Sequence, residues 1–224
     1  MLDDAVMVVA GAGGPAGQAV VRRLAAAGAQ VVAADVRPLT WDDERISGVV
    51  VDLLDAPATR AWAAEVTSTY GRVDGLLHLV GGWRGGESFA GTDLADWALL
   101  HDLLIRTLQH TTLAFHEALR DGPHGRAVIV SQPAAGKPTQ GNAAYAAAKA
   151  AAEAWTLALA DSFTGTPAAA VILVVNALVT DAMLDQNPDQ PGSTHVDDLA
   201  EAIAGLWDRP ADELNGQRID LTQP

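Results

Sequence analysis

The sequence predicts one doubly wound α/β domain, in which helices cover both faces of a parallel sheet of about seven strands. Apolar runs of strand length alternate along the chain with longer Ala- and Leu-rich stretches of helical period, and this alternation is typical of βαβ units. Most of the strand runs are apolar on both faces, as buried parallel strands are. The chain has 224 residues, 49% of them hydrophobic, which suits one sizeable core and is short for two domains. We therefore predict a single domain over residues 1–224.

Seven runs have the length and the apolar composition of strands. In chain order they are Val6–Ala10, Gln30–Asp35, Gly48–Asp52, Gly75–Val80, Arg126–Ser131, Ala169–Val175 and Arg218–Leu221. Between them, stretches of helical period bounded by Gly, Pro, Asp or Thr predict helices. These helices lie near residues 15–28, 57–70, 93–120, 142–163 and 196–208. The connections are short, except for a polar, turn-rich stretch at 185–194 that contains Asn187-Pro188 and Pro191-Gly192 and predicts a surface loop or a lid over 183–195.

The charge of the chain excludes two classes of partner. Its formal net charge is −14, which opposes binding to the phosphate backbone of nucleic acid or to an anionic membrane surface. No apolar run reaches the roughly 18 residues of a membrane span, and the acidic start Met1-Leu-Asp-Asp-Ala lacks the positive segment of a signal peptide. There is no cysteine, hence no thiolate nucleophile or Cys-based zinc site. We expect a soluble, cytoplasmic protein that acts on a small molecule.

A glycine-rich turn follows the first predicted strand directly and precedes the first helix. It reads Gly11-Ala12-Gly13-Gly14-Pro15-Ala16-Gly17. Glycines allow a sharp turn and a close backbone approach to a pyrophosphate, and the free amides of the following helix attract its charge. The alternative is a plain strand-to-helix turn, but the order of strand, glycine turn and helix favours a dinucleotide site in a Rossmann-type domain.

Asp35 ends the second predicted strand about 20 residues after this turn. A carboxylate there accepts hydrogen bonds from the adenosine ribose hydroxyls and repels a 2′-phosphate, which favours NAD(H) over NADP(H). Arg37 lies two residues later, and a guanidinium is the usual partner of a 2′-phosphate. The sequence leaves open whether Arg37 overrides Asp35 and makes NADP(H) an alternative cofactor.

Tyr145 and Lys149 stand four residues apart in the fourth predicted helix, on one helix face. A phenol with its ordinary pKa near 10 is a poor acid–base group at neutral pH, but an adjacent ammonium favours the phenolate. We therefore predict that Tyr145 transfers the proton and that Lys149 lowers its pKa and holds the nicotinamide ribose. The alternative is a partly exposed Tyr and Lys on an amphipathic helix.

With these motifs, the chain resembles the short-chain dehydrogenase/reductase family over essentially its whole length. The resemblance runs through the glycine turn, Asp35, Val51-Asp52-Leu53, His78-Leu79-Val80-Gly81 and the pair Tyr145 and Lys149. It implies an NAD(P)H-dependent oxidoreductase in which Asp52 binds the adenine amino group and Leu53 supplies a backbone amide. The cofactor-binding residues that we expect are Gly11, Gly13, Gly14, Pro15, Ala16, Gly17, Asp35, Val36, Arg37, Asp52, Leu53, Val80, Gly81, Gly82, Lys149 and Val179.

The chain departs from the pattern of this family at several positions. Pro15 stands at the middle glycine, and Gln132 stands at the serine that polarises the substrate carbonyl, with Ser131 one place earlier. Gln132 still donates from its amide, so we take it as the third catalytic candidate and leave open whether Ser131 replaces the serine instead. Further departures fall on Leu104, Asn176-Ala177 and Asp181.

One branch of the family accounts for several departures together. The segment Val80-Gly81-Gly82-Trp83-Arg84-Gly85-Gly86 is similar to the Gly-Gly-Trp segment of dihydropteridine reductase, which lacks the family serine and prefers NADH. The resemblance implies hydride transfer to a planar, conjugated substrate such as a quinonoid dihydropterin, contacted by Trp83, Arg84 and Met183. The alternative for Trp83 is an exposed loop aromatic or an interface anchor.

Two other functions remain open. One is reduction of the carbonyl of a small metabolite, and the other is a non-redox dinucleotide sensor or lyase on the same fold. The six histidines show no metal-ligand spacing, so we expect no metal site; His78, at a strand end, is equally a ligand-contacting or a structural residue. The small-residue face 150–160 with Trp155 predicts a homodimer or homotetramer.

Overall fold

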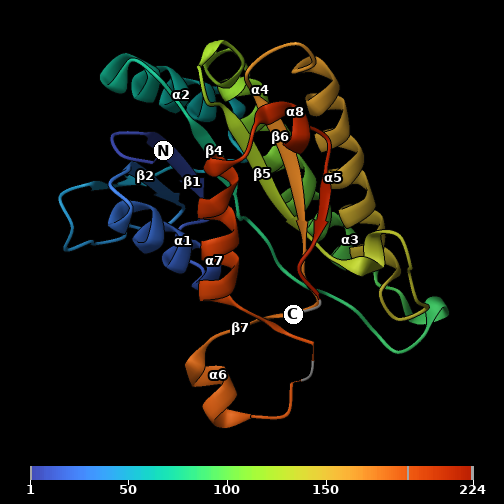
Figure 1. Cartoon of the computed structure of the whole chain (residues 1–224). Coiled ribbons are helices and arrows are strands. Elements are labelled where there is room, and N and C mark those ends of the chain that lie inside the picture. Colours follow the sequence, from blue (N-terminus) through green and yellow to red (C-terminus); the bar gives the residue numbers. More distant parts are fainter. Residues whose placement is uncertain (1, 191, 223–224) are drawn as a thin grey trace.

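The computed structural model of the chain describes residues 2–190 and 192–222, so Met1 and Pro191 lie outside the described residues. Its centre is a parallel sheet of seven strands in the order β3-β2-β1-β4-β5-β6-β9 (Figure 1). The strands are β1 Val6–Ala10, β2 Gln30–Asp35, β3 Ile46–Val50, β4 Gly75–His78, β5 Arg126–Ser131, β6 Ala169–Val174 and β9 Arg218–Asp220. This confirms the predicted doubly wound α/β class.

The first, second and fifth predicted strands have the expected bounds, and the others differ at their ends. The third begins and ends two residues early, because Asp52 turns the chain by accepting the Leu54 amide at 2.9 Å. The fourth ends at His78 instead of Val80. The sixth and the last are each one residue shorter than predicted.

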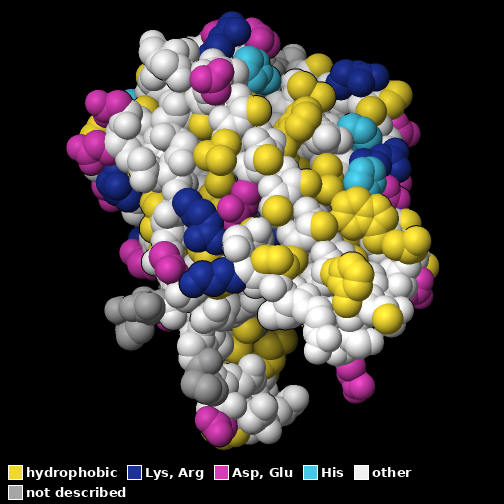
Figure 2. Space-filling view, turned by 90° about the vertical axis from the view of Figure 1, so that its right-hand side faces the viewer, with side chains coloured by type: hydrophobic (Ala, Val, Ile, Leu, Met, Phe, Trp, Pro, Cys, Tyr) yellow, Lys and Arg dark blue, Asp and Glu magenta, His cyan; other side chains and the backbone are white. Residues whose placement is uncertain are grey.

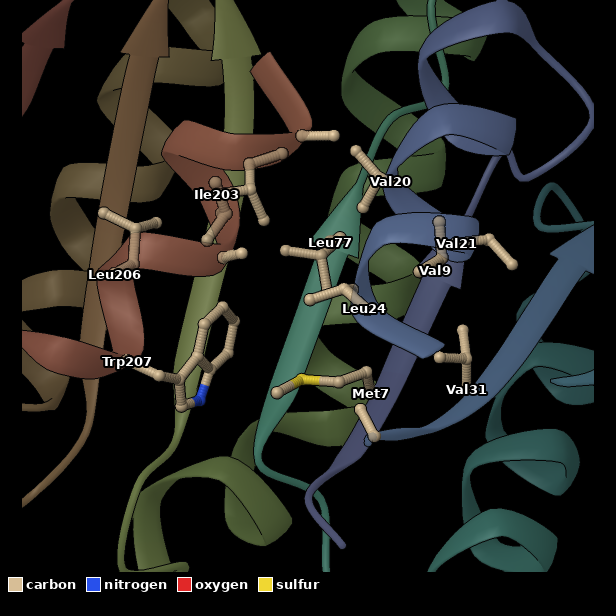
Figure 3. Close-up of a cluster of buried hydrophobic side chains, with 14 of the residues drawn as sticks. Met7, Val9, Val20, Val21, Leu24, Val31, Leu77, Ile203, Leu206 and Trp207 are labelled. Carbon is tan, nitrogen blue, oxygen red and sulfur yellow. The ribbon is translucent and has the colours of Figure 1, made fainter. Parts of the chain in front are cut away.

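Helices cover both faces of the sheet (Figure 1). On one face lie α1 Pro15–Ala26 and α7 Val196–Ala204, and on the other lie α2 Ala56–Tyr70, α4 Thr107–Asp121 and α5 Ala143–Ser162. Alternate residues of each central strand point to opposite faces. Met7 and Val9 therefore pack with α1 and α7, around Leu24 and Trp207 (Figure 3), while Val8 and Ala10 join the cluster under α2 and α4.

The predicted helix at 93–120 is three elements in one helical path. α3 Leu94–His101 passes into a wider π-helical turn, η2 Asp102–Arg106, and then into α4. Turns of this type are rare and often lie near functional sites. Leu100 and Leu104 pack here against Ala148 of α5, which places the π turn beside the helix that carries Tyr145.

The segment between β6 and α7 contains structure that the sequence did not predict. A two-residue strand β7 Leu178–Val179 pairs with β8 Thr194–His195, and α6 Asp181–Gln186 lies between them. Thr180 caps α6, because its hydroxyl accepts the Met183 amide at 3.3 Å. The other short elements are η1 Phe89–Gly91, η3 Pro133–Ala135, η4 Gly205–Asp208 and α8 Ala211–Leu214.

All strands of the main sheet run parallel, so their carboxyl ends lie along one edge. In an open α/β sheet, ligands bind at this edge, where the strand order reverses between β1 and β4. The glycine turn, the loop after β4 and η3 all follow strand ends at this edge, and α6 projects beyond it (Figure 1).

Candidate active site

The glycine turn after β1 depends on glycine at both of its ends. Gly11 has a φ of +84°, and a Cβ there would come within 2.8 Å of the Val80 amide nitrogen. A Cβ on Gly17 would collide with the carbonyl oxygen of Gly11. The turn therefore brings the start of α1 close to the loop after β4, as a dinucleotide-binding turn requires.

The start of α1 carries donors that suit an anion. The amides of Ala16 and Gly17, in the first helical turn, have no acceptor among the described residues, although Gly17 is buried. Pro15, the first residue of α1, has no amide hydrogen, so it neither adds a donor nor loses one. The positive end of the helix and these free amides fit the pyrophosphate of a dinucleotide.

Asp35 lies against this turn. Its Oδ2 accepts the Gly13 amide at 2.9 Å, its Oδ1 accepts the Arg37 amide at 3.2 Å, and the Arg37 guanidinium lies 3.7 Å away. The Asp35 side chain is only 11% exposed, whereas that of Arg37 is 75% exposed. Val36 between them is exposed. The carboxylate is thus held against the glycine turn, whereas the guanidinium beside it is mostly exposed.

The residues expected to bind adenine follow β3. Asp52 is exposed and accepts the Leu54 amide, while Leu53 is buried and its carbonyl bonds to Nδ1 of His110 at 2.7 Å. The amide of Val51 donates to the carbonyl of Asp35 at 3.0 Å, so both strand ends lie side by side. Asp52 and Asp35 therefore share one end of the site.

His78, at the end of β4, is a structural residue. It is buried, its Nε2 lies 3.2 Å from Oγ1 of Thr107, and its Nδ1 lies 3.1 Å from Oγ1 of Thr111. Burial and the nearby ammonium of Lys149 lower the pKa of His78 to about 3. The imidazole is neutral, with both nitrogens engaged, and this decides between the two roles that the sequence left open.

Tyr145 and Lys149 meet on α5 as predicted. Nζ of Lys149 lies 5.8 Å from the centre of the Tyr145 ring and donates to the carbonyl of Val130 at 2.8 Å. Burial lowers the pKa of Lys149 to about 8, against the opposing charge of Glu153, and burial raises the pKa of Tyr145 to about 12. The structure thus differs from the expectation that Lys149 lowers the pKa of the phenol, because burial disfavours the phenolate.

The two candidates for the serine role have separate functions in the structure. Ser131 is buried, and its hydroxyl donates to Oε1 of Glu153 at 2.5 Å. Gln132 caps η3, because its Oε1 accepts the Ala134 amide at 2.7 Å, and its Nε2 makes a long 3.4 Å contact with the carbonyl of Asn176. The cap fixes the orientation of the Gln132 amide, so its NH2 group is the part left to donate to a ligand.

The loop after β4 presents an exposed indole. Trp83 is 62% exposed, and its ring covers Gly85, where a Cβ would lie 2.6 Å from Cζ2. The loop is fixed to the start of α5, since the amide of Gly86 donates to the carbonyl of Gly141 at 2.7 Å. Arg84 lies 3.6 Å from a carboxylate oxygen of Asp96 on α3.

The remaining predicted residues lie on neighbouring segments. Val80, Gly81 and Gly82 form the start of the same loop, and a Cβ on Gly82 would meet Leu103 of the π turn at 3.2 Å. Val179 is buried in β7, and Met183 is half-exposed on α6.

A groove of about 680 Å³ is lined by residues of α1, of the start of α6 and of α7. Pro15 and Gln18 of α1 line one wall, and Thr180, Asp181 and His195 line the other. Nε2 of His195 lies 3.4 Å from Oδ1 of Asp181, which joins β8 to the start of α6.

Glu153 belongs to this site but was not predicted from the sequence. It lies four residues after Lys149, so the same spacing that singled out Tyr145 and Lys149 extends to it. Within the described part of the chain, no group of three or more His, Asp or Glu side chains is arranged to hold a metal ion. Likewise, none of the described helices has the length and apolarity to cross a membrane.

Comparison with known proteins assigns a family to most of the chain. The profile of the family described as short chain dehydrogenase matches residues 5–191. The acetoacetyl-CoA reductase of Synechocystis sp. is 28% identical over 149 residues, which cover 66% of this chain but only 61% of that protein. The short-chain reductase protein NovJ of Streptomyces niveus is 27% identical over 208 residues, 89% of this chain and 78% of that protein.

Solved structures have the same fold. The 3-ketoacyl-(acyl-carrier-protein) reductase from Brucella melitensis, complexed with NADH, superimposes with a TM-score of 0.85 at 22% identity, over 99% of this chain and 98% of that chain. ElxO with NADP bound gives a TM-score of 0.87 at 14% identity, over 97% of both chains. At these identities the likeness concerns the fold alone.

Proposed function

The chain belongs to the short chain dehydrogenase family, and from this we propose that it is an NADH-dependent reductase of a planar, conjugated substrate such as a quinonoid dihydropterin. The observation that carries the proposal is the placement of Tyr145 and Lys149 on one face of α5, together with an exposed indole on the loop after β4. Both segments lie at the edge of the sheet where the glycine turn stands.

The dinucleotide would be held by the glycine turn, Asp35 and Lys149. The free amides at the start of α1 would bind the pyrophosphate, and Asp35 would accept from the adenosine ribose. A carboxylate that is 11% exposed and fixed by the Gly13 amide supports a preference for NADH, because it would face the extra phosphate of NADPH. Arg37 is the residue through which NADPH would bind instead.

Two residues of α5 would transfer the proton and bind the nicotinamide ribose. When bound, the nicotinamide supplies the hydride. Tyr145, whose pKa is raised by burial to about 12, stays protonated at neutral pH and donates its proton to the reduced substrate. Lys149 would hold the nicotinamide ribose with its ammonium.

The substrate side of the site supports a flat, conjugated ring. The exposed face of Trp83 offers a stacking surface, and Arg84 on the same loop and Met183 on α6 would contact the substrate. The buried Ser131 hydroxyl already donates its hydrogen bond to Glu153, so it is not available to polarise a substrate carbonyl. A quinonoid ring needs less polarisation than an isolated ketone and therefore suits this site.

A specific observation favours a second candidate, reduction of the carbonyl of a small metabolite. The NH2 group of Gln132 is oriented by the cap on η3 and would donate to a developing oxyanion. The relatives that are named acetoacetyl-CoA reductases support this class of substrate.

The test follows NADH absorbance with quinonoid dihydropterins and with small ketones and 3-ketoacyl thioesters. If the first proposal holds, Gln132→Ala is tolerated on the pterin, and Trp83→Ala lowers kcat/KM by about ten-fold. Phe89→Ala is the matched control, because Phe89 is another exposed aromatic residue between β4 and α3.

Loss of activity on ketones in Gln132→Ala, with no pterin activity in the native protein, would favour the second candidate. If no substrate oxidises NADH, both reductase proposals fail, and a non-redox dinucleotide sensor or lyase becomes the better interpretation.

We further propose that the chain forms a homodimer or homotetramer. The outer faces of α4 and α5 expose Leu113 and Leu157, and Figure 2 shows many hydrophobic side chains on the side of the molecule that bears α5. Sedimentation of the native protein and of Leu157→Glu tests this: a monomer in the native protein contradicts it.

A further inference from the structure

The face of α5 that carries Tyr145 and Lys149 continues to a third ionisable group. Glu153 lies one helical turn beyond Lys149, and its side chain is only 15% exposed. The proposed function gives it no role. A carboxylate so far removed from water must be hydrogen-bonded or paired, and its partners show what it does.

Glu153 is held from two strands. The hydroxyl of Ser131, the last residue of β5, donates to its Oε1 at 2.5 Å. Nε of Arg218, the first residue of β9, donates to both carboxylate oxygens, at 3.2 Å and 3.1 Å. The carboxylate is therefore fixed in position by donors on both sides.

Lys149 and Glu153 contact consecutive residues of β5. Nζ of Lys149 donates to the carbonyl of Val130, and Oε1 of Glu153 accepts from the next side chain, Ser131. The two side chains thus hold the end of one strand against α5, and the acceptor of the ammonium is part of the strand that Glu153 anchors.

Glu153 is the acidic residue whose charge acts on the ammonium of Lys149. From β4, His78 faces the ammonium as a neutral ring, and from α5 Tyr145 faces it as a phenol. Arg218 of β9 lies behind Glu153 and would itself oppose the ammonium. Burial lowers the pKa of Lys149, and the charge of Glu153 raises it again.

We propose that Glu153 is a positioning residue, which keeps the buried ammonium of Lys149 charged at neutral pH and anchors the strand end that accepts its hydrogen bond. The proposal rests on the proposed function only for its effect on turnover. It predicts that the charge of Glu153, and not merely its volume or its bond to Ser131, sets the proton affinity of Lys149.

The chain suits a direct test, because it has only two lysines, Lys149 and Lys137. Their side-chain resonances can be titrated by carbon NMR in the protein without added cofactor, with the exposed Lys137 as an internal reference. E153Q keeps the size of the side chain and an acceptor for Ser131 but removes the charge. S131A keeps the charge but removes that hydrogen bond.

We expect E153Q to lower the titration midpoint of Lys149 by about one pH unit and to leave Lys137 unchanged. S131A should produce a clearly smaller shift. R218Q removes the cation that offsets Glu153, so it should move the midpoint in the opposite direction, upward. Because Arg218 lies on a short edge strand, R218Q serves the test even if E153Q fails to fold.

In turnover of NADH, the decline of kcat/KM at alkaline pH should move to lower pH by the same amount in E153Q, since an uncharged Lys149 no longer holds the ribose. An unchanged Lys149 midpoint in both folded E153Q and R218Q overturns the proposal, as does an equal shift in S131A and E153Q. If the native protein never oxidises NADH, the proposed function fails while the titration still decides the role of Glu153.

Discussion

The amide of Gly13 donates to Oδ2 of Asp35 across 2.9 Å and so ties the glycine turn after β1 to the end of β2. A Cβ on Gly13 would lie 2.6 Å from the same oxygen, so the turn and the carboxylate fit each other only with glycine at this position. The Asp35 side chain therefore both fixes the conformation of the turn and places a negative charge beside it. This links the choice of cofactor to the conformation of the turn.

Cofactor preference follows from this contact. NADH should bind about ten-fold or more tightly than NADPH, because the carboxylate of Asp35 would face the extra phosphate. Asp35→Asn keeps an acceptor for Gly13 and should narrow the difference, whereas Asp35→Ala should also weaken NADH. Arg37→Ala is the control and should widen the preference. Calorimetry measures each affinity. If the native protein binds NADPH more tightly than NADH, Arg37 rather than Asp35 determines the choice of cofactor.

Replacement of Tyr145 by Phe should lower kcat by about 10² or more and leave the affinity for NADH nearly intact, because only the donated proton is lost. Since burial raises the pKa of Tyr145 to about 12, the native rate should not fall through ionisation of the phenol at any pH below about 10. Steady-state kinetics and NADH titration measure both effects. Full turnover of Tyr145→Phe on every accepted substrate would remove the acid role.

His78 should make the protein sensitive to acid. Its pKa is lowered by burial from 6.5 to about 3, so below pH 6.5 the unfolded chain takes up a proton that the folded chain refuses. The free energy of unfolding should then fall by about 1.4 kcal/mol per pH unit from this residue alone. Urea unfolding between pH 8 and about 5 should show a shallower pH dependence for His78→Gln than for the native protein.

Lys149 should cost stability for the sake of function. Burial lowers the pKa of Lys149 from 10.5 to about 8, so keeping this lysine protonated below pH 8 lowers the free energy of unfolding. The free energy of unfolding should rise again as the pH increases from about 8 to 10.5, where the folded lysine is already deprotonated. Lys149→Met should therefore raise the free energy of unfolding at pH 7 by about 1–3 kcal/mol and abolish NADH turnover. Lys137→Met, at an exposed position, should change neither. A destabilised Lys149→Met would show that the bond to Val130 outweighs the burial of charge.

Gly141 should be required for the loop that bears Trp83. A Cβ there would collide with the carbonyl of Gly86, whose amide bonds to Gly141. Gly141→Ala should lower kcat/KM several-fold without weakening NADH, because the loop contacts the substrate side of the site. Gly136→Ala is the matched control, since a Cβ at Gly136 meets no atom within 4 Å. If Gly141→Ala and Gly136→Ala have equal kinetic constants, the loop does not contribute to substrate binding.

The sequence predicted the strands of the sheet because their apolar runs are buried on both faces, a pattern that few other structures require. It also paired Tyr145 with Lys149, because helical spacing alone brings them together. It could not decide the role of His78, since the two threonines that satisfy its ring come from α4, 29 and 33 residues away. Nor could it predict that burial would raise the pKa of the phenol, which depends on packing across several elements.

The segment after β6 was predicted least well. The sequence indicated a loop at 185–194, where the structure has the end of α6 and the strand β8. Both elements are short, and β8 exists only by pairing with β7, so local composition carries little signal for either. The role of Ser131 was hidden for a similar reason, because its acceptor Glu153 belongs to the following helix.

The π turn at Asp102–Arg106 has a consequence for how α3 can change in length. A π turn holds one residue more than the α-helical turn that it replaces, so deleting any one residue of it would restore a regular helix. Both kinds of turn complete one full rotation of the helical path, so this deletion would leave the direction in which α3 presents its side chains nearly unchanged relative to α4. Leu100 would therefore keep its place against Ala148. In a regular α-helix each residue advances the path by about 100°, so deleting one residue within α4 would instead rotate the residues before it by that angle. The chain is thus expected to tolerate a single deletion within the π turn better than one within α4.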